Sequence, residues 1–485
     1  MTPSLEAPRR FLLAGEWAGS GEATPVRAPY DGRIIALVHR AARADVEAAI
    51  AAAAAWHGER KLPPAHHRAA ILSEVAARIV AAQESLALDL ALEAGKPIRL
   101  ARAEVERASI TFRTAAAEAL RLDGEAFALD GVPGGEGRWA ITRRFPVGPV
   151  GAITPFNFPL NLVAHKLAPA FAAGCPIVLK PATQTPLSAL ALARLLHEAG
   201  APPGAVSVLP CAAAEARALV EDPRVAHLTF TGSAEVGWEL RARAGRKRVT
   251  LELGGNAGVL ILPDADLDLA ARRCAEGGFA YAGQSCISVQ RIFVHRDVAA
   301  EFEQRLVAAG EAQLHGDPLD EGVSVGPMIG EAEAARAESW VGEAVSAGAR
   351  RLLGGERRGA LLAPTILAGV DPSLRVACRE VFAPVVVLAS VASAREGIEQ
   401  LGRSEFGLQA GIFTRDLEAV LSAFRDVEVG ALVVNDVPTF RLDPMPYGGV
   451  RGSGVGREGP RYAIHEMTEP RLLLLNHLGS VDHER

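Results

Sequence analysis

Residues 147–180, VGPVGAITPFNFPLNLVAHKLAPAFAAGCPIVLK, decide the fold that we predict for this chain. Short apolar runs at 147–153 and 176–180 flank a helix-length apolar segment at 160–173. Strands that are buried on both faces of a parallel sheet have this continuous apolar character, and a helix usually connects them. The stretch therefore predicts a strand, a crossover helix and a second strand parallel to the first.

The same alternation continues to residue 251. We predict further strands and helices at 187–199, 205–209, 212–221, 226–231, 234–244 and 248–251. This rhythm is typical of a doubly wound α/β sheet, whose ligands bind beyond the carboxyl ends of the strands. Thr154, Lys180, Thr231 and Glu252 lie at or just after strand ends. None of these strands is followed by GxGxxG, so the usual dinucleotide-binding loop is not predicted.

Length and composition restrict the class of protein. With 485 residues the chain is too long for one hydrophobic core, so we expect two or three domains. A net charge of −6 disfavours a general nucleic-acid binder. No apolar run approaches the roughly 20 residues that span a bilayer, and Met1 to Trp17 does not resemble a secretory signal. We therefore expect a cytoplasmic protein with no membrane partner.

The cysteines point to one candidate nucleophile. No CxxC pair occurs, which disfavours a thiolate metal site or a disulfide framework. Cys286 lies in Gly283-Gln-Ser-Cys286-Ile-Ser288, a loop expected between a helix at 267–281 and a strand at 290–295. A glycine-flanked loop allows close approach to a substrate, and oriented backbone donors favour the thiolate. The remaining cysteines are predicted to fill the core: Cys175, Cys211, Cys274 and Cys378.

Two further regions flank the alternating segment. A second α/β region is expected from about 258 to 432. Residues 123–146 combine glycines with alternating Trp139, Ile141 and Phe145, which predicts an extended hairpin. The apolar run at 470–476 predicts a strand that pairs with the hairpin of a neighbouring subunit.

Taken together, the motifs resemble those of the aldehyde dehydrogenase superfamily, in the family's order and over essentially the whole chain. The matching stretches are Pro155-Phe-Asn-Phe-Pro159, Leu179-Lys-Pro181, Phe230-Thr-Gly-Ser233, Glu252-Leu-Gly-Gly255, Gly283-Gln-Ser-Cys286, Glu380-Val-Phe-Ala-Pro384 and Pro446-Tyr-Gly-Gly449. The resemblance implies an α/β fold with a Rossmann-type cofactor domain, an α/β catalytic domain and a small β oligomerisation element. We expect these domains at 1–122 with 147–252, at 253–435, and at 123–146 with 470–485, and a late loop at 436–469 that lines the substrate tunnel.

The resemblance implies NAD(P)-dependent oxidation of an aldehyde to a carboxylic acid. Cys286 would attack the aldehyde carbon and carry first a thiohemiacetal and then a thioester. The Asn157 amide and the Cys286 backbone N–H would stabilise the oxyanion, since fixed donors do this effectively. Glu252 would activate the water that hydrolyses the thioester. No metal is expected.

Cofactor contacts also follow from the resemblance. Lys180 corresponds to the lysine on the adenosine ribose, Ser233 to the pyrophosphate contact, and Glu380 to the carboxylate on the nicotinamide ribose. Thr183 stands where NAD-preferring members often have glutamate, and without that carboxylate Lys180 can serve a 2′-phosphate. NADP is therefore slightly favoured over NAD. The full set of predicted cofactor residues is Thr154, Pro155, Phe156, Lys180, Thr183, Gly232, Ser233, Leu253, Glu380 and Phe382.

Residues 435–447 resemble the branch of lactaldehyde and non-phosphorylating glyceraldehyde-3-phosphate dehydrogenases. Phosphate-using members hold the anion with an arginine in this loop, where Arg441 falls, and they also place an arginine where this chain has Ser285. A small polar or anionic aldehyde is therefore expected: lactaldehyde, glyceraldehyde, a semialdehyde, or a phosphono- or sulfo-aldehyde. Arg113 and His165 are further candidate substrate contacts, although Arg441 could equally form a loop ion pair and His165 a structural contact.

The sequence also leaves other functions open. A CoA-acylating dehydrogenase would not need Glu252, and a binding protein of the same fold would not need the set of Cys286, Glu252 and Asn157. A cysteine–histidine hydrolase lacks support from any histidine motif. By resemblance, the chain is expected to form a homodimer or homotetramer.

Overall fold

The structure is a computed structural model that describes residues 7–19, 22–59 and 62–476. Its first sheet has the strand order β2-β1-β9-β8-β7-β10-β11-β23. The five central strands β9, β8, β7, β10 and β11 run parallel to one another. At the two sides of this group, β1 pairs with β9 and β23 pairs with β11 in the antiparallel sense. These strands are β1 (Phe11–Leu13), β2 (Glu16–Ala18), β7 (Val150–Ile153), β8 (Ile177–Lys180), β9 (Val206–Val208), β10 (His227–Thr231), β11 (Arg248–Glu252) and β23 (Gly454–Val455).

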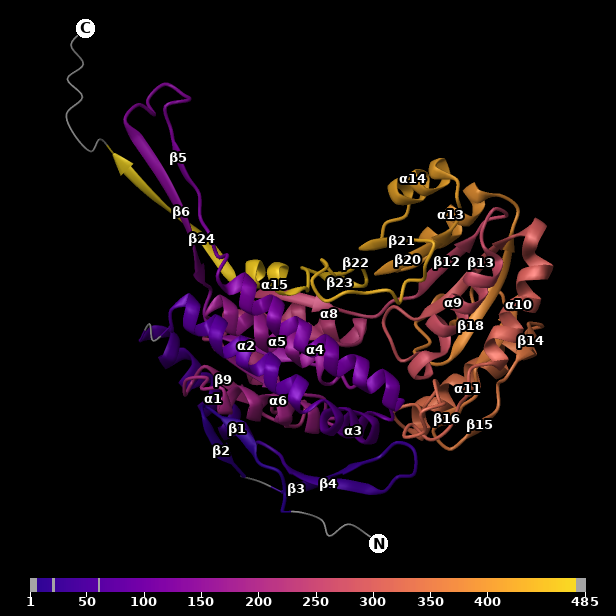
Figure 1. The fold of residues 1–485 in the computed structure, drawn as a ribbon, viewed down its shortest axis with the longest axis horizontal. Helices are drawn as coiled ribbons and strands as arrows, with labels where there is room; N and C mark the ends of the chain where they lie inside the picture. Colours follow the sequence, from indigo (N-terminus) through magenta and orange to yellow (C-terminus); the bar gives the residue numbers. More distant parts are fainter. Residues whose placement is uncertain (1–6, 20–21, 60–61, 477–485) are drawn as a thin grey trace.

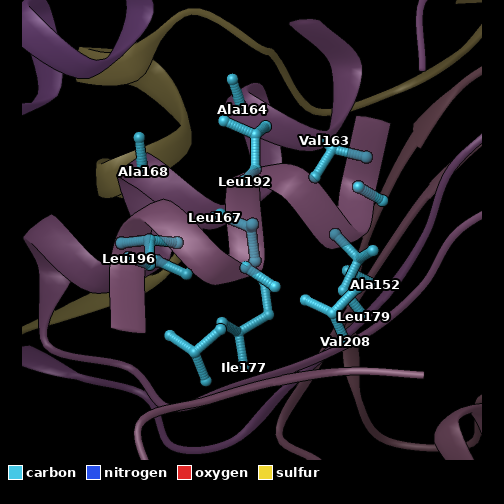
Figure 2. Packing of buried hydrophobic residues seen from close by; sticks show 14 of the residues in the cluster. Ala152, Val163, Ala164, Leu167, Ala168, Ile177, Leu179, Leu192, Leu196 and Val208 are labelled. Carbon is cyan, nitrogen blue, oxygen red and sulfur yellow. The ribbon is translucent and has the colours of Figure 1, made fainter. Parts of the chain in front are cut away.

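Helices cover the first sheet, as Figure 1 shows. They are α1 (Arg43–Gly58), α2 (Ala65–Ala81), α3 (Gln83–Ala94), α4 (Ile98–Ala119), α5 (Asn161–Ala173), α6 (Leu187–Glu198), α7 (Arg217–Glu221) and α8 (Ala234–Arg243). Every residue of α5 is buried, which explains why its sequence is apolar apart from Asn161, His165 and Lys166. Figure 2 shows Leu167 of α5 and Leu192 of α6 among side chains from the strands, including Ile177 and Leu179. The predicted order of strand, helix and strand over residues 147–180 is confirmed.

The second sheet has the order β14-β17-β18-β13-β12-β20-β21 and is parallel except between β14 and β17. Its strands are β12 (Ala257–Ile261), β13 (Val289–His295), β14 (Arg350–Leu353), β17 (Thr365–Ala368), β18 (Val385–Val391), β20 (Gln409–Phe413) and β21 (Ala431–Val434). The helices of this region are α9 (Leu267–Phe279), α10 (Ala299–Glu311), α11 (Glu331–Ser346), α12 (Arg375–Cys378), α13 (Ala394–Gly402) and α14 (Leu417–Asp426). A separate apolar core under this sheet includes Phe279, Phe302 and Phe413.

Short elements complete the chain. They are β3 (Ala23–Arg27), β4 (Ile34–His39), β15 (Arg357–Arg358), β16 (Leu361–Leu362), β19 (Phe406–Gly407), β22 (Val450–Arg451), α15 (Pro460–Glu466) and the 3₁₀ turns η1 (Ala280–Gly283) and η2 (Arg296–Val298). Within the described ranges, no helix is both long and apolar enough to cross a membrane.

A small sheet projects from the body of the molecule (Figure 1). It has the order β24-β6-β5, with β5 at Ala126–Ala128, β6 at Arg138–Pro146 and β24 at Thr468–Asn476. The tail strand β24 pairs with β6 of the same chain, and its pairing with a neighbouring subunit stays a prediction. Residues 477–485 of the predicted oligomerisation element lie outside the described residues. The domain boundaries expected from the sequence stay predictions, although the return of β23 to the first sheet is consistent with the late loop at 436–469.

Candidate active site

A cavity of about 940 Å³ lies between the carboxyl ends of the first sheet and the loops of the second. Its walls include Asn157 after β7, Glu252 at the end of β11 and Cys286 before β13. Three residues far apart in the sequence thus line one cavity. The structure brings together the predicted nucleophile, oxyanion donor and base.

The backbone before Cys286 has an unusual conformation. Tyr281, Ala282 and Gly283 have φ values of 52°, 53° and 65°, in the left-handed region. For a residue other than glycine this conformation costs roughly 1–2 kcal/mol, so packing must hold it. A Cβ on Gly283 would lie 2.1 Å from the carbonyl oxygen of Ala383, and only glycine fits there. This tight turn determines where the Cys286 loop enters the cavity.

The Cys286 thiol contacts a second side chain in the cavity. Its Sγ lies 2.9 Å from the hydroxyl of Tyr447, and either atom can donate. Burial raises the pKa of Cys286 to about 12, while the hydrogen bond to Tyr447 and the charge of Arg441 lower it. The thiol is therefore neutral in this state, and Tyr447 is the group placed to donate to the thiolate when it forms.

Replacing Tyr447 with phenylalanine is expected to slow alkylation of Cys286 by iodoacetamide about tenfold at a given alkaline pH. The missing O–H removes a donor to the thiolate, and a hydrogen bond to a charged group contributes roughly 1.5–3 kcal/mol. The measurement is the rate of Cys286 modification between pH 7 and 10, followed by mass spectrometry. Tyr462→Phe is the matched control, because Tyr462 lies outside the cavity. Equal rates in both variants would contradict a donating role for Tyr447.

Glu252 is buried, and neither carboxylate oxygen has a hydrogen-bond partner among the described residues. Burial raises its pKa well above the usual value, the charge of Glu458 raises it further, and Lys166, Arg441 and Arg457 oppose the rise. The Glu252 carboxyl therefore holds its proton more tightly than an exposed glutamate does. A carboxyl with an elevated pKa and free oxygens can exchange a proton with a water molecule in the cavity.

The pKa of Glu458, the neighbour of Glu252, is shifted in the opposite direction. Its Oε1 accepts from Lys166 Nζ at 2.5 Å, and its Oε2 accepts from Arg441 at 3.2 Å. Burial alone would raise its pKa, but the charges of Lys166, His165 and Arg441 hold the pKa of Glu458 at about 2. Two neighbouring carboxyls with separated pKa values are typical of an acid–base pair.

Asn157 is held in place from both sides. Its side-chain Nδ2 donates to the backbone carbonyl oxygen of Gln284 at 2.9 Å, and its backbone carbonyl oxygen accepts from Lys96 Nζ at 2.8 Å. Lys96 is fully buried, forms an ion pair with Glu104 and lies over the ring of Phe158, 3.7 Å from its centroid. Burial lowers the pKa of Lys96 to about 8, although Glu104 raises it. Sequence reasoning missed Lys96 and Glu104, whose only signal was a charged residue at the helix stop Gly95-Lys96-Pro97.

One part of the cavity wall suits a dinucleotide. The predicted residues found there are Pro155, Phe156, Gly232, Ser233, Leu253, Glu380 and Phe382. Gly232 and Ser233 precede helix α8, whose free backbone N–H groups favour a pyrophosphate. Burial raises the pKa of Glu380 to about 7, although the Gly255 N–H donates to it at 2.9 Å. Phe382 packs edge-on against Phe156, with ring centroids 5.9 Å apart.

The other predicted cofactor residues lie outside the cavity wall. Thr154 is buried after β7, and Lys180 ends β8 with its Nζ donating to the Pro181 carbonyl at 3.0 Å. Thr183 is exposed. Their assignment to the adenosine end of the cofactor stays a prediction.

The substrate side of the cavity differs from expectation at two positions. Ser285 and Arg441 line it, but Arg113 is exposed on α4 and His165 is buried behind the wall. The cavity contains Arg107 of α4 in place of Arg113, because helical periodicity turns position 107 toward Glu104 and position 113 away. His165 instead contacts Asp443, with its Nε2 2.9 Å from Oδ1.

The two arginines of the cavity have different surroundings. Arg107 binds Asp443 through Nε and Nη2, at 3.1 and 2.9 Å, and keeps about a quarter of its side chain exposed (26%). Arg441 is buried, stacks 3.6 Å from the centroid of the Tyr447 ring and leaves its Nε without a partner among the described residues. Burial would lower the pKa of Arg441, but Tyr447 and Glu458 raise it. The cavity therefore contains permanent positive charge beside the thiol.

Known proteins resemble this chain over nearly its whole length. The sequence model described as "Aldehyde dehydrogenase family" matches residues 17–473. A 3-sulfolactaldehyde dehydrogenase of Priestia aryabhattai is 46% identical over 467 residues, which cover 96% of this chain and 98% of that protein. The crystal structure of aldehyde dehydrogenase 21 from Physcomitrella patens, in complex with the reaction product succinate, superposes with a TM-score of 0.95 and 41% identity, covering 98% of this chain and 100% of that one.

A second solved structure is GapN, the glyceraldehyde-3-phosphate dehydrogenase of Methanocaldococcus jannaschii, complexed with NADP. It has a TM-score of 0.90 and 39% identity, and the match covers 94% of this chain and 100% of that one. The chain therefore belongs to the aldehyde dehydrogenase family. It is an oxidoreductase that acts on aldehydes, and the fold class and family expected from its sequence are confirmed.

Proposed function

We propose that this enzyme oxidises a small anionic aldehyde to the carboxylic acid through a covalent intermediate on Cys286. The observation that supports this most directly is that Cys286, Glu252 and Asn157 share one cavity with Arg107 and Arg441. A thiol, a carboxyl of raised pKa and an amide supply the nucleophile, base and oxyanion donor of such a reaction.

The first half of the reaction uses the thiol and the amide. The Cys286 thiolate adds to the aldehyde carbon, and the carbonyl oxygen becomes an oxyanion. Asn157 has a second Nδ2–H in addition to the one donated to Gln284, and this N–H can stabilise the oxyanion. Lys96 and Glu104 keep the Asn157 backbone in place. When the carbon loses its hydride, the bond to Cys286 becomes a thioester.

The second half uses Glu252. Water attacks the thioester while Glu252 takes its proton, and the carboxylic acid leaves as the Cys286 thiol is restored. In a CoA-acylating enzyme a thiol would replace this water. The free oxygens of Glu252 favour hydrolysis, because they leave a base directly in the cavity. A binding protein of the same fold would have no use for this base.

The proposed cofactor is NAD or NADP, which supplies the hydride acceptor. Its fit rests on the N-terminus of α8, the Glu380 carboxylate and the space at Gly254, where a Cβ would lie 2.2 Å from Glu380 Oε2. The Thr183 position slightly favours NADP, and the M. jannaschii relative was crystallised with NADP.

The proposed substrate is an aldehyde with a sulfonate, carboxylate or similar anion, such as 3-sulfolactaldehyde. The P. aryabhattai relative carries that substrate in its name, and the P. patens structure contains the dianion succinate. Arg441 has an unpartnered Nε and Arg107 is partly exposed, so each can still donate to an anion. Ser285 lacks the charge of the arginine found in phosphate-using members, which disfavours a phosphate ester.

Wild-type enzyme is expected to prefer 3-sulfolactaldehyde over uncharged lactaldehyde by about tenfold or more in kcat/KM, since one charged hydrogen bond contributes this much. The Arg441→Gln and Arg107→Gln variants should lose most of this preference. Arg113→Gln, on the same helix as Arg107 but exposed, is the control and should behave as wild type. Assays with NAD and NADP in parallel give the cofactor preference, and a strong preference for NAD would contradict the inference from Thr183.

We also propose that the chain forms a homodimer or homotetramer through its projecting sheet. Leu472, Leu473 and Leu474 of the edge strand β24 are exposed by 45% or more, as is Trp139 of β6. An apolar, unpaired sheet edge is a site for association with another chain.

A further inference from the structure

A second cavity lies at the base of the projecting sheet, apart from the cavity that holds Cys286. It has a volume of about 510 Å³ and is enclosed by the ends of α1 and α4, the start of α2, and strands β6 and β24. Its described walls contain Arg68, Arg143, Arg144 and Arg471 but no aspartate or glutamate. We call it the arginine cavity.

Two of these arginines repel each other within the sheet. Arg143 of β6 is directly opposite Arg471 of β24, and like charges at opposed positions destabilise a strand pair. Both guanidinium groups also lie over the ring of Phe145, 5.4 and 4.6 Å from its centroid. The ring thus gathers two cations at one side of the cavity. An anion bound between the two guanidinium groups would attract both of them and offset their mutual repulsion.

Arg68 adds a buried cation. Its residue surface is only 6% exposed, and its Nε and Nη1 donate to the carbonyl oxygens of Ala172 and Pro63 at 3.0 and 2.6 Å. In the described part of the chain it has no carboxylate partner, and burial lowers its pKa. An unpaired buried charge is costly, which makes this position suited to a ligand of opposite charge.

Trp56 provides an independent observation. It also lines the arginine cavity, and its buried Nε1–H has no hydrogen-bond partner among the described residues. Buried indole N–H groups usually find an acceptor. An anion in the cavity would supply one.

Most other arginines differ from this set. Arg43 forms an ion pair with Glu47 at 2.9 Å, and Arg350 with Glu303 at 2.8 Å. Next to the arginine cavity, Glu469 forms its ion pair with Arg248, which lies outside the cavity wall. The four arginines of the arginine cavity form no such ion pair with the described residues.

We propose that the arginine cavity binds a small polyanion, of the class of phosphate-bearing metabolites. Guanidinium groups match phosphate oxygens with paired N–H donors, and a cavity of this volume accommodates a small organic molecule. This site is separate from the proposed aldehyde oxidation and does not depend on it.

Inorganic pyrophosphate is the probe, titrated into the enzyme by calorimetry with NADP⁺ saturating so that the cofactor cavity is blocked. We expect saturable binding of one pyrophosphate per chain and a change in tryptophan emission that is lost in Trp56→Phe. In the double variant Arg143→Gln with Arg471→Gln, affinity should fall about tenfold or more, because two charged donors are removed. Both side chains are exposed, so the variant should fold.

The matched control is the double variant Arg43→Gln with Arg350→Gln, which removes the same charge from exposed ion pairs. It should bind pyrophosphate as wild type does. Absence of saturable binding, or equal affinity in the two double variants, would overturn the proposal. A further outcome would also overturn the proposal: wild type does not bind pyrophosphate, and the Arg143/Arg471 variant changes its oligomer mass. That result would assign these arginines to a subunit contact.

Discussion

Replacing Cys286 with alanine is expected to lower aldehyde oxidation by roughly 10⁴-fold or more, because loss of a covalent nucleophile removes the whole route and not one contact. The variant should show neither a burst of NAD(P)H nor steady-state turnover. Its fold should persist, since Cys286 is half-buried and the turn at Tyr281 to Gly283 is held by backbone packing. The measurement is NAD(P)H absorbance over a long incubation, together with thermal unfolding.

The control for this loss is Cys378→Ala. Cys378 is also half-buried but donates to the carbonyl of Ser373 and lies outside the active-site cavity. It should keep wild-type activity. Comparable activity in Cys286→Ala would show that the thiol is not the nucleophile and would remove the basis of the covalent mechanism.

Much of the fold could be predicted because it depends on local patterns. The apolar runs at 147–153 and 176–180 became β7 and β8, since a strand buried on both faces needs a continuous apolar sequence. The helix predicted at 212–221 shortened to α7, Arg217–Glu221. Alanine-rich sequence favours a helix but cannot maintain one without packing. Residues 212–214 are exposed, and residues 213–216 form turns.

The site could be predicted only in part. Cys286, Glu252 and Asn157 were found because each stands in a motif of its own. Arg107 and Tyr447 were missed as site residues because their roles depend on which face of α4 meets the cavity and on a loop that returns from far along the chain. Such long-range contacts have no local signal. On α4, helical periodicity places Arg107 on the face of buried Glu104 and Arg113 on the opposite face. This periodicity could have identified Arg107 as the better candidate from the sequence.

Replacing Glu252 with glutamine is expected to separate the two halves of the reaction. Thiol attack and hydride loss do not need the carboxylate, so a burst of about one NAD(P)H per active site should remain. Hydrolysis should then slow by roughly 10²–10⁴-fold, the usual contribution of a general base. Stopped-flow absorbance gives both phases, and acid quenching followed by mass spectrometry should find the acyl group on Cys286. A variant with normal steady-state turnover would exclude Glu252 as the base.

The raised pKa of Glu252 leads to a second, independent expectation for the same variant, which concerns its thermal stability. In the unfolded chain this carboxyl ionises near its ordinary pKa, but in the folded protein burial keeps the proton on to much higher pH. The folded state therefore binds more protons over that interval, and the contribution of Glu252 to stability decreases as the pH rises through it. Glutamine is neutral at every pH and removes this cost. Glu252→Gln should thus unfold at the same temperature as wild type or higher at pH 7, while hydrolysis is lost. A variant that was both inactive and much less stable would indicate that Glu252 supports the structure, and its loss of turnover could not then be assigned to the missing base.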